Sequence, residues 1–282
     1  MKKYSILFFS LCVSMHLFAQ AKPPRLIIRG DDMGATHATN EAIIKTFKSG
    51  IETSVEVIVP SPWFLEAVKF LNENPSIDVG VHLALSSEWD NVKWRPLTAA
   101  SSLRDSNGYF FPKIFADVHY PKQSLSENKW KIEDIEAELR AQIEMALRFI
   151  PRISHVSAHM GCTNLTKEIK ILEKKLTREY KIDIDLEDYK VFSVGYVGAH
   201  ATLSEKIESF SKMLKSLEAG KTYMYLDHPA LDGAEMQAVH HIGYENVAAD
   251  RQSVADLWTN AEIKSLIKQL GIQLLSYADL KK

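Results

Sequence analysis

Short runs rich in β-branched and other apolar residues alternate with longer stretches of helical period through nearly the whole sequence. The short runs cover 26–29, 54–59, 79–85, 153–158, 191–194, 222–226 and 273–275. The helical stretches cover 40–49, 62–74, 132–149, 165–180, 204–219 and 253–270. This alternation is typical of βα units on a parallel sheet. The sequence therefore predicts an α/β fold, a distorted or incomplete (β/α) TIM-like barrel.

Residues 1–21 have the features of an export signal. Lys2 and Lys3 supply positive charge, an apolar run follows at 6–13, and Ala19-Gln20-Ala21 fits a cleavage site. We therefore expect an exported protein, periplasmic or secreted. Residues 22–282 contain no Pro/Gly/Ser-rich linker, low-complexity tract or clear repeat, which predicts a single barrel domain.

Composition excludes several classes of partner. No later apolar run approaches the eighteen residues of a membrane span. Loss of 1–21 would remove two lysines and no acids, taking the formal net charge from −2 to −4. A mildly acidic protein is not expected to have nucleic acid as a binding partner. Cys162 would then be the one cysteine left, so a core must stabilise the fold without an intrachain disulfide. The composition leaves open whether the chain forms a homodimer.

Polar side chains follow the predicted strands, where the active sites of such barrels lie. They are Asp31, Asp32, His82, His159 and His228. An isolated Asp pair is more often a turn, and a lone histidine is more often structural. Together they favour a site for Zn²⁺ or another divalent transition metal. Neighbouring residues of an extended strand point in opposite directions, so we expect only one of the two aspartates to face the ion and its neighbour to move a proton.

Three side chains near the predicted strand ends allow more than one role. His155 and His159 are too far apart on an extended chain to bind one ion, so His155 belongs to the core or supports a ligand. Cys162 is better explained as a buried thiol than as a soft ligand. Pro229 stiffens the chain after His228, whose ring could protonate a leaving amine. The polar contexts of His200, His240 and His241 indicate no role.

The segment 86–130 lacks regular periodicity but carries many aromatic side chains. A loop this long in a compact domain is usually functional or disordered, and its aromatic content argues against disorder. Two interpretations are open: part of it forms a wall that stacks on sugar rings, or the rings anchor the loop to the barrel.

The motifs together resemble the YdjC-like carbohydrate deacetylase family, which includes the chitooligosaccharide deacetylases. They are Asp31-Asp32-Met33-Gly34, Asn40-Glu41-Ala42-Ile43, Gly50-Ile51-Glu52-Thr53-Ser54, Val79-Gly80-Val81-His82-Leu83-Ala84-Leu85, Ile153-Ser154-His155-Val156-Ser157-Ala158-His159, Asp227-His228-Pro229 and Arg251. The resemblance covers nearly all of 22–282. It implies a distorted barrel, one divalent ion (zinc or magnesium), and removal of an N-acetyl group from an amino sugar.

The resemblance also implies roles for single residues. Asp32, His82 and His159 correspond to the metal ligands, Asp31 to the general base and His228 to the acid. The sequence departs from the family where an acidic residue is common between the two histidines, because Ser157 and Ala158 stand there. Arg29 is also unusual, and it either contacts a charged substrate group or neutralises the acidic cluster. Arg29, His155 and Arg251 are the residues expected to support the ligands or contact substrate.

The leading hypothesis is a metal-dependent hydrolase that releases acetate from an N-acetylated sugar. One alternative is a secreted sugar-binding barrel without turnover, although a binder has no need of a base beside a metal ligand. The other is a metal-dependent phosphoesterase, but the sequence lacks a Gly-rich phosphate cradle and a Lys/Arg cluster at a strand end.

Overall fold

The computed structural model describes residues 22–282, so the export signal predicted at 1–21 lies outside the described residues. The strands are β1 (Arg25–Met33), β2 (Ser54–Val57), β3 (Asp78–Leu83), β4 (His155–Ala158), β5 (Val191–Val194), β6 (Thr222–Asp227) and β7 (Gln273–Leu274). The α-helices are α1 (His37–Ser49), α2 (Phe64–Glu73), α3 (Ile132–Phe149), α4 (Lys167–Glu179), α5 (Leu203–Ser216), α6 (Ala234–Gln237), α7 (Val247–Thr259) and α8 (Ala261–Gln269).

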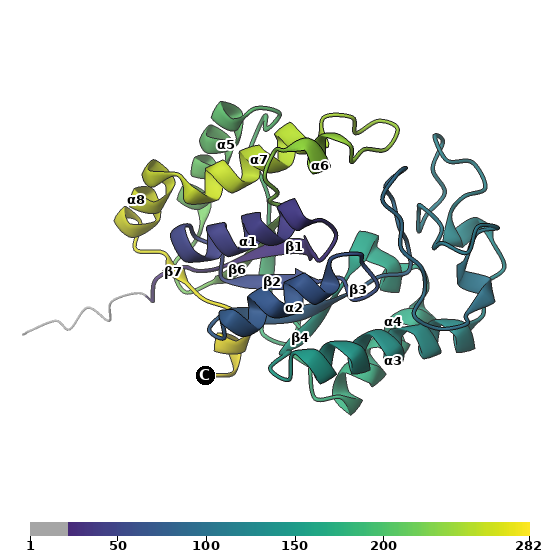
Figure 1. Cartoon of the computed structure of the whole chain (residues 1–282). Coiled ribbons are helices and arrows are strands. Elements are labelled where there is room, and N and C mark those ends of the chain that lie inside the picture. The colour runs from purple at the N-terminus through teal and green to yellow at the C-terminus, as the bar shows by residue number, and fades with distance from the viewer. Residues whose placement is uncertain (1–21) are drawn as a thin grey trace, which may run out of the picture.

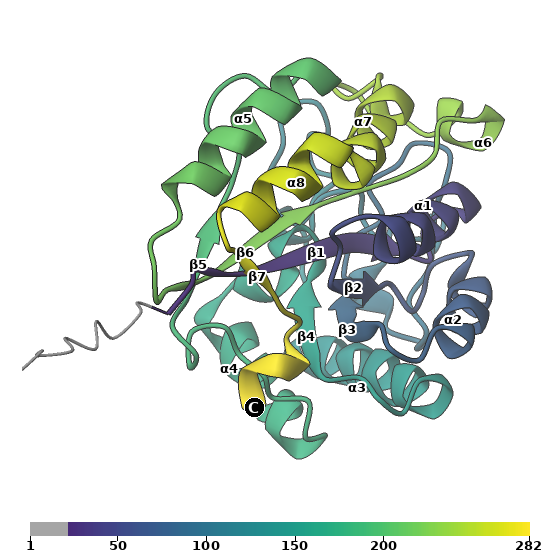
Figure 2. The ribbon, with the colours of Figure 1, turned by 90° about the vertical axis from the view of Figure 1, so that its left-hand side faces the viewer.

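The strands form one parallel sheet that curls into an incomplete barrel. Their order is β4-β3-β2-β1-β6-β5, and the short β7 pairs with the beginning of β1. The strands β4 and β5 are the two ends of this order, so the barrel is open between them. Figure 1 shows the sheet at the centre of the molecule, and Figure 2 shows the helices around its outer side. The predicted distorted α/β barrel is confirmed.

The sequence of β1 explains its central position. Leu26, Ile27 and Ile28 are completely buried, because neighbouring strands flank β1 and both faces are covered. Alternate side chains face opposite sides. Ile27 packs inside the barrel with Met224 and Tyr277, whereas Leu26 and Ile28 pack with residues of α5, α7 and α8. Two residues above Ile27, Arg29 also faces the interior, where it donates a hydrogen bond to the Tyr277 hydroxyl.

Most predicted helix boundaries lie within one to three residues of the observed ones, and two of the differences are at the beginnings of α1 and α7. The first helix begins at His37, not at residue 40, because the Thr36 side chain accepts a hydrogen bond from the Thr39 amide and caps it. The stretch predicted as helical at 253–270 is two helices that begin earlier, at Val247. The Asn260 side chain accepts hydrogen bonds from two amides of α8 and marks the break between the two helices.

The long segment 86–130 contains only two 3₁₀ turns, Ser101–Leu103 and Leu125–Glu127, among its loops. Most of its rings are buried: Trp89, Trp94, Phe110, Phe111 and Tyr120 are each at most 9 % exposed. These rings anchor the loop to the barrel, as one of the two interpretations predicted. Within residues 22–282, no helix combines the length and the apolar character that crossing a bilayer requires.

Candidate metal centre

A β-bulge at the end of β1 positions the aspartate pair. Gly30 pairs with Val55 and Met33 with Val57, so β1 carries one extra residue between these two pairs. Asp32 has a φ of 69°, a left-handed conformation that Asp tolerates better than most residues. The bulge interrupts the alternation of the strand, and both aspartates line the same cleft. Asp32 Oδ1 is the oxygen that faces both imidazoles, and Asp31 lies beside them in the same cleft.

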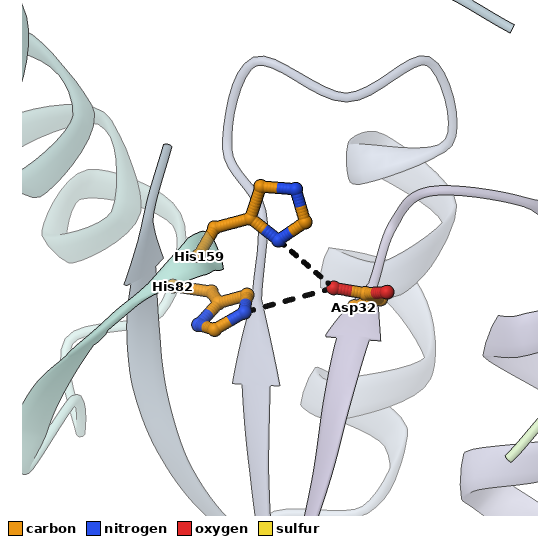
Figure 3. A group of neighbouring side chains, drawn as sticks. All are labelled: Asp32, His82 and His159. Atoms are coloured by element: carbon orange, nitrogen blue, oxygen red, sulfur yellow. Dashed lines mark ion pairs between the residues drawn. The ribbon is translucent and has the colours of Figure 1, made fainter. Parts of the chain in front are cut away.

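Three side chains, from β1, from β3 and from the residue after β4, meet at this end of the sheet (Figure 3). Asp32 Oδ1 lies 3.6 Å from His82 Nε2 at the end of β3, and 3.2 Å from His159 Nδ1, directly after β4. Ligand atoms that share one tetrahedral ion at about 2.1 Å lie about 3.4 Å apart. The spacing of Asp32, His82 and His159 therefore fits a divalent ion with three protein ligands and an open position.

The hydrogen bonding of Asp32 also fits a cation. Its Oδ2 accepts a hydrogen bond from Arg251 Nη2 at 2.8 Å. Its Oδ1, which faces the two imidazoles, is buried and has no hydrogen-bond partner among the described residues. Burial would raise the pKa of the Asp32 carboxyl, but the charges of Arg251 and His228 hold it well below its usual range. A buried carboxylate oxygen without a donor is costly unless a cation binds it.

The two histidines differ in their surroundings. Burial lowers the pKa of His82 to about 4, so its ring is neutral at pH 7 and has one nitrogen free to bind an ion. His159 Nε2 lies 2.9 Å from Glu88 Oε2, on the side of the ring away from Asp32. The carboxylates of Glu88 and Asp32 outweigh burial and raise the pKa of His159 to about 10. Glu88 thus occupies the place of a carboxylate that orients a histidine ligand.

Asp31 lies beside this triad, and Arg29 holds both of its oxygens. Asp31 Oδ2 is 3.8 Å from His82 Nε2. His228, which follows β6, lines the same cleft of about 380 Å³. Burial would lower the pKa of His228, but the carboxylates of Asp32 and Asp227 raise it. One cleft therefore contains a carboxylate and an imidazole beside the three candidate ligands.

The structure also places the remaining residues that the sequence singled out. His155 is completely buried beneath the cleft and lies 2.5 Å from Glu56, so it belongs to the polar interior of the barrel. Cys162 is a buried free thiol, as predicted. Arg29 neutralises the acidic cluster, in agreement with one of its two proposed roles. Arg251 supports Asp32.

Sequence reasoning missed three residues around the cleft. Glu88 lies five positions after the third strand. An acidic residue shortly after a strand end is a sequence feature that could have identified Glu88 as a site residue. Glu56 is a charged residue inside an apolar run, which implies a buried partner. His241, to which no role was assigned, lines the cleft and stacks on Trp89 with ring centroids 5.5 Å apart. Glu88 and Trp89 both belong to the 86–130 loop and line the cleft, so part of this loop contributes to the wall as well.

Comparisons with known proteins show what this chain is similar to. A family model described as YdjC-like protein matches residues 25–269. A carbohydrate deacetylase from Enterococcus faecalis is 26 % identical over 91 % of this chain and 98 % of its own length. Another, from Thermus thermophilus, is 36 % identical over 56 % of this chain and 51 % of its own length.

One solved structure shares the fold closely. It belongs to an Enterococcus faecalis V583 protein named for cellobiose-phosphate cleavage, and it superposes with a TM-score of 0.72. The sequence identity is 23 %, and the match covers 92 % of this chain and 99 % of that one. At this identity, the likeness supports the arrangement of strands and helices.

Proposed function

Because the chain belongs to the YdjC-like protein family, we propose that it is a metal-dependent carbohydrate deacetylase, which hydrolyses the N-acetyl group of an amino sugar. The observation that supports this most is the meeting of Asp31, Asp32, His82, His159 and His228 in one cleft. The products are acetate and a free amino sugar. Relatives that match nearly the full chain bear the name carbohydrate deacetylase.

Asp32, His82 and His159 would hold one divalent ion, zinc or magnesium. Such an ion supplies Lewis acidity toward the acetamide carbonyl and makes water more acidic. Asp31 accepts the proton of the attacking water, because Arg29 fixes its carboxylate toward the cleft. Arg251 holds the outer oxygen of Asp32, so that the inner oxygen stays directed between the two imidazoles.

His228 is the proposed acid. The C–N bond of an amide breaks readily only when the nitrogen receives a proton, because an amide anion is a poor leaving group. The raised pKa of His228 favours a protonated ring that can donate to this nitrogen. Asp227, beside it, accepts hydrogen bonds from the hydroxyls of Tyr196 and Tyr225, which fixes the base of the His228 loop.

The charges of the cleft favour an amide over a phosphate ester as the substrate. Arg29 and Arg251 are the two arginines that line it, and each already pairs with an aspartate. No lysine lines it within residues 22–282. A phosphoesterase would require unpaired donors for the phosphate oxygens, so the phosphoesterase alternative is not favoured.

The deciding experiment measures acetate release from N-acetylated mono- and oligosaccharides, using metal-stripped protein and protein reloaded with Zn²⁺ or Mg²⁺. We expect turnover that requires the ion and is lost in Asp31→Asn. His200→Ala is the matched control, because this exposed histidine lies outside the cleft. If no substrate released acetate with either ion, while sugar binding persisted, the binding-barrel alternative would replace the deacetylase.

We also propose that the protein is exported to the periplasm or secreted, on the basis of the signal predicted at 1–21, which lies outside the described residues. Immunoblots of periplasmic, secreted and cytoplasmic fractions from a bacterial host would test it. We expect the exported form to be shorter than the full chain, with its N-terminus after residue 21.

A further inference from the structure

A row of buried hydrogen bonds runs beneath the cleft, on the side of His82 opposite Asp32. His82 Nδ1 lies 2.6 Å from Ser157 Oγ, and Ser157 Oγ donates to Glu56 Oε2 at 2.5 Å. Glu56 Oε1 lies 2.5 Å from His155 Nε2. The row runs from β3 to β4, on to β2 and back to β4, and each of these four side chains is at most 9 % exposed. The proposed reaction uses only His82.

The protons along this row can be assigned from the number of donors. A serine hydroxyl has one hydrogen, and a carboxylate without a proton can only accept. Burial would raise the pKa of Glu56, but His155 and Arg29 lower it to about 2, so Glu56 is an acceptor. The hydrogen of Ser157 therefore points to Glu56. Ser157 must accept from His82, which places the proton of His82 on Nδ1 and leaves Nε2 as a lone pair.

The barrel has space for this row at one specific position. Gly80 lies on β3 two residues before His82 and faces the same side. A Cβ at position 80 would lie 2.4 Å from Glu56 Oε2 and 2.5 Å from His155 Nε2. His155 is in turn stacked on Tyr277 at a centroid distance of 3.6 Å, with its Nδ1 2.7 Å from Ser154 Oγ. Glu56 is therefore held on both sides in one orientation.

We propose that Glu56 and Ser157 are positioning residues for His82: the carboxylate on β2 acts through the hydroxyl on β4 to hold His82 with Nδ1 protonated and Nε2 directed at the cation. Histidine ligands commonly donate their second nitrogen to a carboxylate in this way. The position between His155 and His159, where the sequence lacks the acidic residue common in the family, thus receives its negative charge from β2, which lies two strands away in the sheet. The inference rests on the proposed function for the identity of the site, but it concerns metal binding alone.

The tautomer of His82 is the first test. In metal-free protein labelled with ¹⁵N, long-range ¹H–¹⁵N spectra distinguish a protonated Nδ1 from a protonated Nε2, and His82→Gln identifies the signal. We expect wild-type His82 to be protonated on Nδ1, and Ser157→Ala to become a mixture of both tautomers. A wild-type signal with the proton on Nε2 would overturn the proposal.

Metal affinity is the second test, measured by competition of Zn²⁺ with a chelator. We expect Ser157→Ala and Glu56→Gln to weaken Zn²⁺ binding by about 10- to 100-fold, the usual effect of losing such a partner. Glu138→Gln is the matched control, since Glu138 is equally buried but bonds to the backbone of 97–98 and does not line the cleft. Equal affinities of Glu56→Gln and Glu138→Gln would contradict the proposal.

A double variant separates positioning from general damage to the fold. Ser157→Asp places a carboxylate directly beside His82, and Glu56→Ala makes room for it and removes the competing charge. We expect this double variant to bind Zn²⁺ within about tenfold of wild type, and Ser157→Asn with Glu56→Ala to bind more weakly. If the Asp and Asn variants bound equally, the charge would have no role. None of these measurements uses substrate, so their outcome is independent of whether the protein releases acetate.

Discussion

Arg29 holds both oxygens of Asp31: its Nε lies 2.7 Å from Oδ1, and its Nη2 lies 2.9 Å from Oδ2. The two residues are neighbours on one face of β1, because side chains two positions apart in a strand point the same way. Such a two-pronged ion pair fixes the plane of the carboxylate as well as its charge. Arg29, which is unusual at its position in the family, thereby neutralises the buried carboxylate of Asp31, the proposed base.

Arg29→Met should destabilise the fold by about 3–5 kcal/mol, since it leaves a buried carboxylate without its partner. Adding Asp31→Asn should recover most of this loss, because the unpaired charge is then gone. Urea unfolding of the metal-free proteins measures both effects. If the single variant were as stable as wild type, the pair would have no structural role.

Removal of any one of the three ligands should reduce bound metal from about one ion per chain to a small fraction. The variants are Asp32→Ala, His82→Ala and His159→Ala. Elemental analysis after dialysis against Zn²⁺ provides the measurement. His200→Ala should keep the wild-type content. A normal content in His82→Ala would remove His82 from the ligand set and with it the proposed role of Glu56 and Ser157.

Asp31→Asn should retain the metal and lose turnover by about 10²-fold or more, as expected of a general base. Asp31 also lines the cleft, but both of its oxygens are engaged by Arg29, which leaves Asp32 as the carboxylate free to bind the ion. Metal content and acetate release are measured on the same sample. Parallel loss of both would make Asp31 a ligand.

Titration of Glu52 should lower the free energy of unfolding as the pH rises above the pKa that Glu52 has in the unfolded chain. Burial raises the pKa of the Glu52 carboxyl well above 4.5; its Oε2 is hydrogen-bonded with Thr46, and its Oε1 has no partner among the described residues. The unfolded chain releases this proton near its ordinary pKa while the folded chain keeps it. The protonated Glu52 carboxyl therefore makes its full contribution to the free energy of unfolding at low pH. Above the unfolded pKa this contribution falls by up to about 1.4 kcal/mol for each pH unit.

Glu52→Gln removes this titration. Its free energy of unfolding should rise relative to that of wild type between about pH 5 and pH 7, even if the amide is less stable at the acidic end. Urea titrations at several pH values compare the two slopes. Parallel curves for variant and wild type would show that Glu52 ionises equally in both states.

The alternation of strands and helices was sufficient to predict the barrel, and the strand ends were sufficient to find His82, His159 and His228. Each of these signals is local in sequence. Glu56 was missed because its meaning depends on Ser157 and His155, which lie about a hundred residues away. The position of both aspartates in one cleft could not be predicted for a related reason, since the bulge depends on how β1 pairs with β2.

The role of the aromatic side chains in 86–130 also depends on contacts that are distant in sequence. Composition identified the aromatic content of 86–130, but whether Trp89 faces sugar or core depends on packing against His241 and Arg251, whose guanidinium lies 5.0 Å from the Trp89 ring centroid. Trp89 is 2 % exposed, so it shapes the cleft wall from behind, while the better exposed His241 lies over it.

His228→Ala should keep the fold and the metal but lose about 10² to 10⁴ in kcat on acetamide sugars, because the amine then leaves without a proton. The loss should be much smaller on an activated acetate ester, whose leaving group needs no proton. Acetate release from both substrates, with metal content determined in parallel, tests this. Equal losses on amide and ester would instead indicate that His228 stabilises charge on the carbonyl oxygen, or has only a structural role.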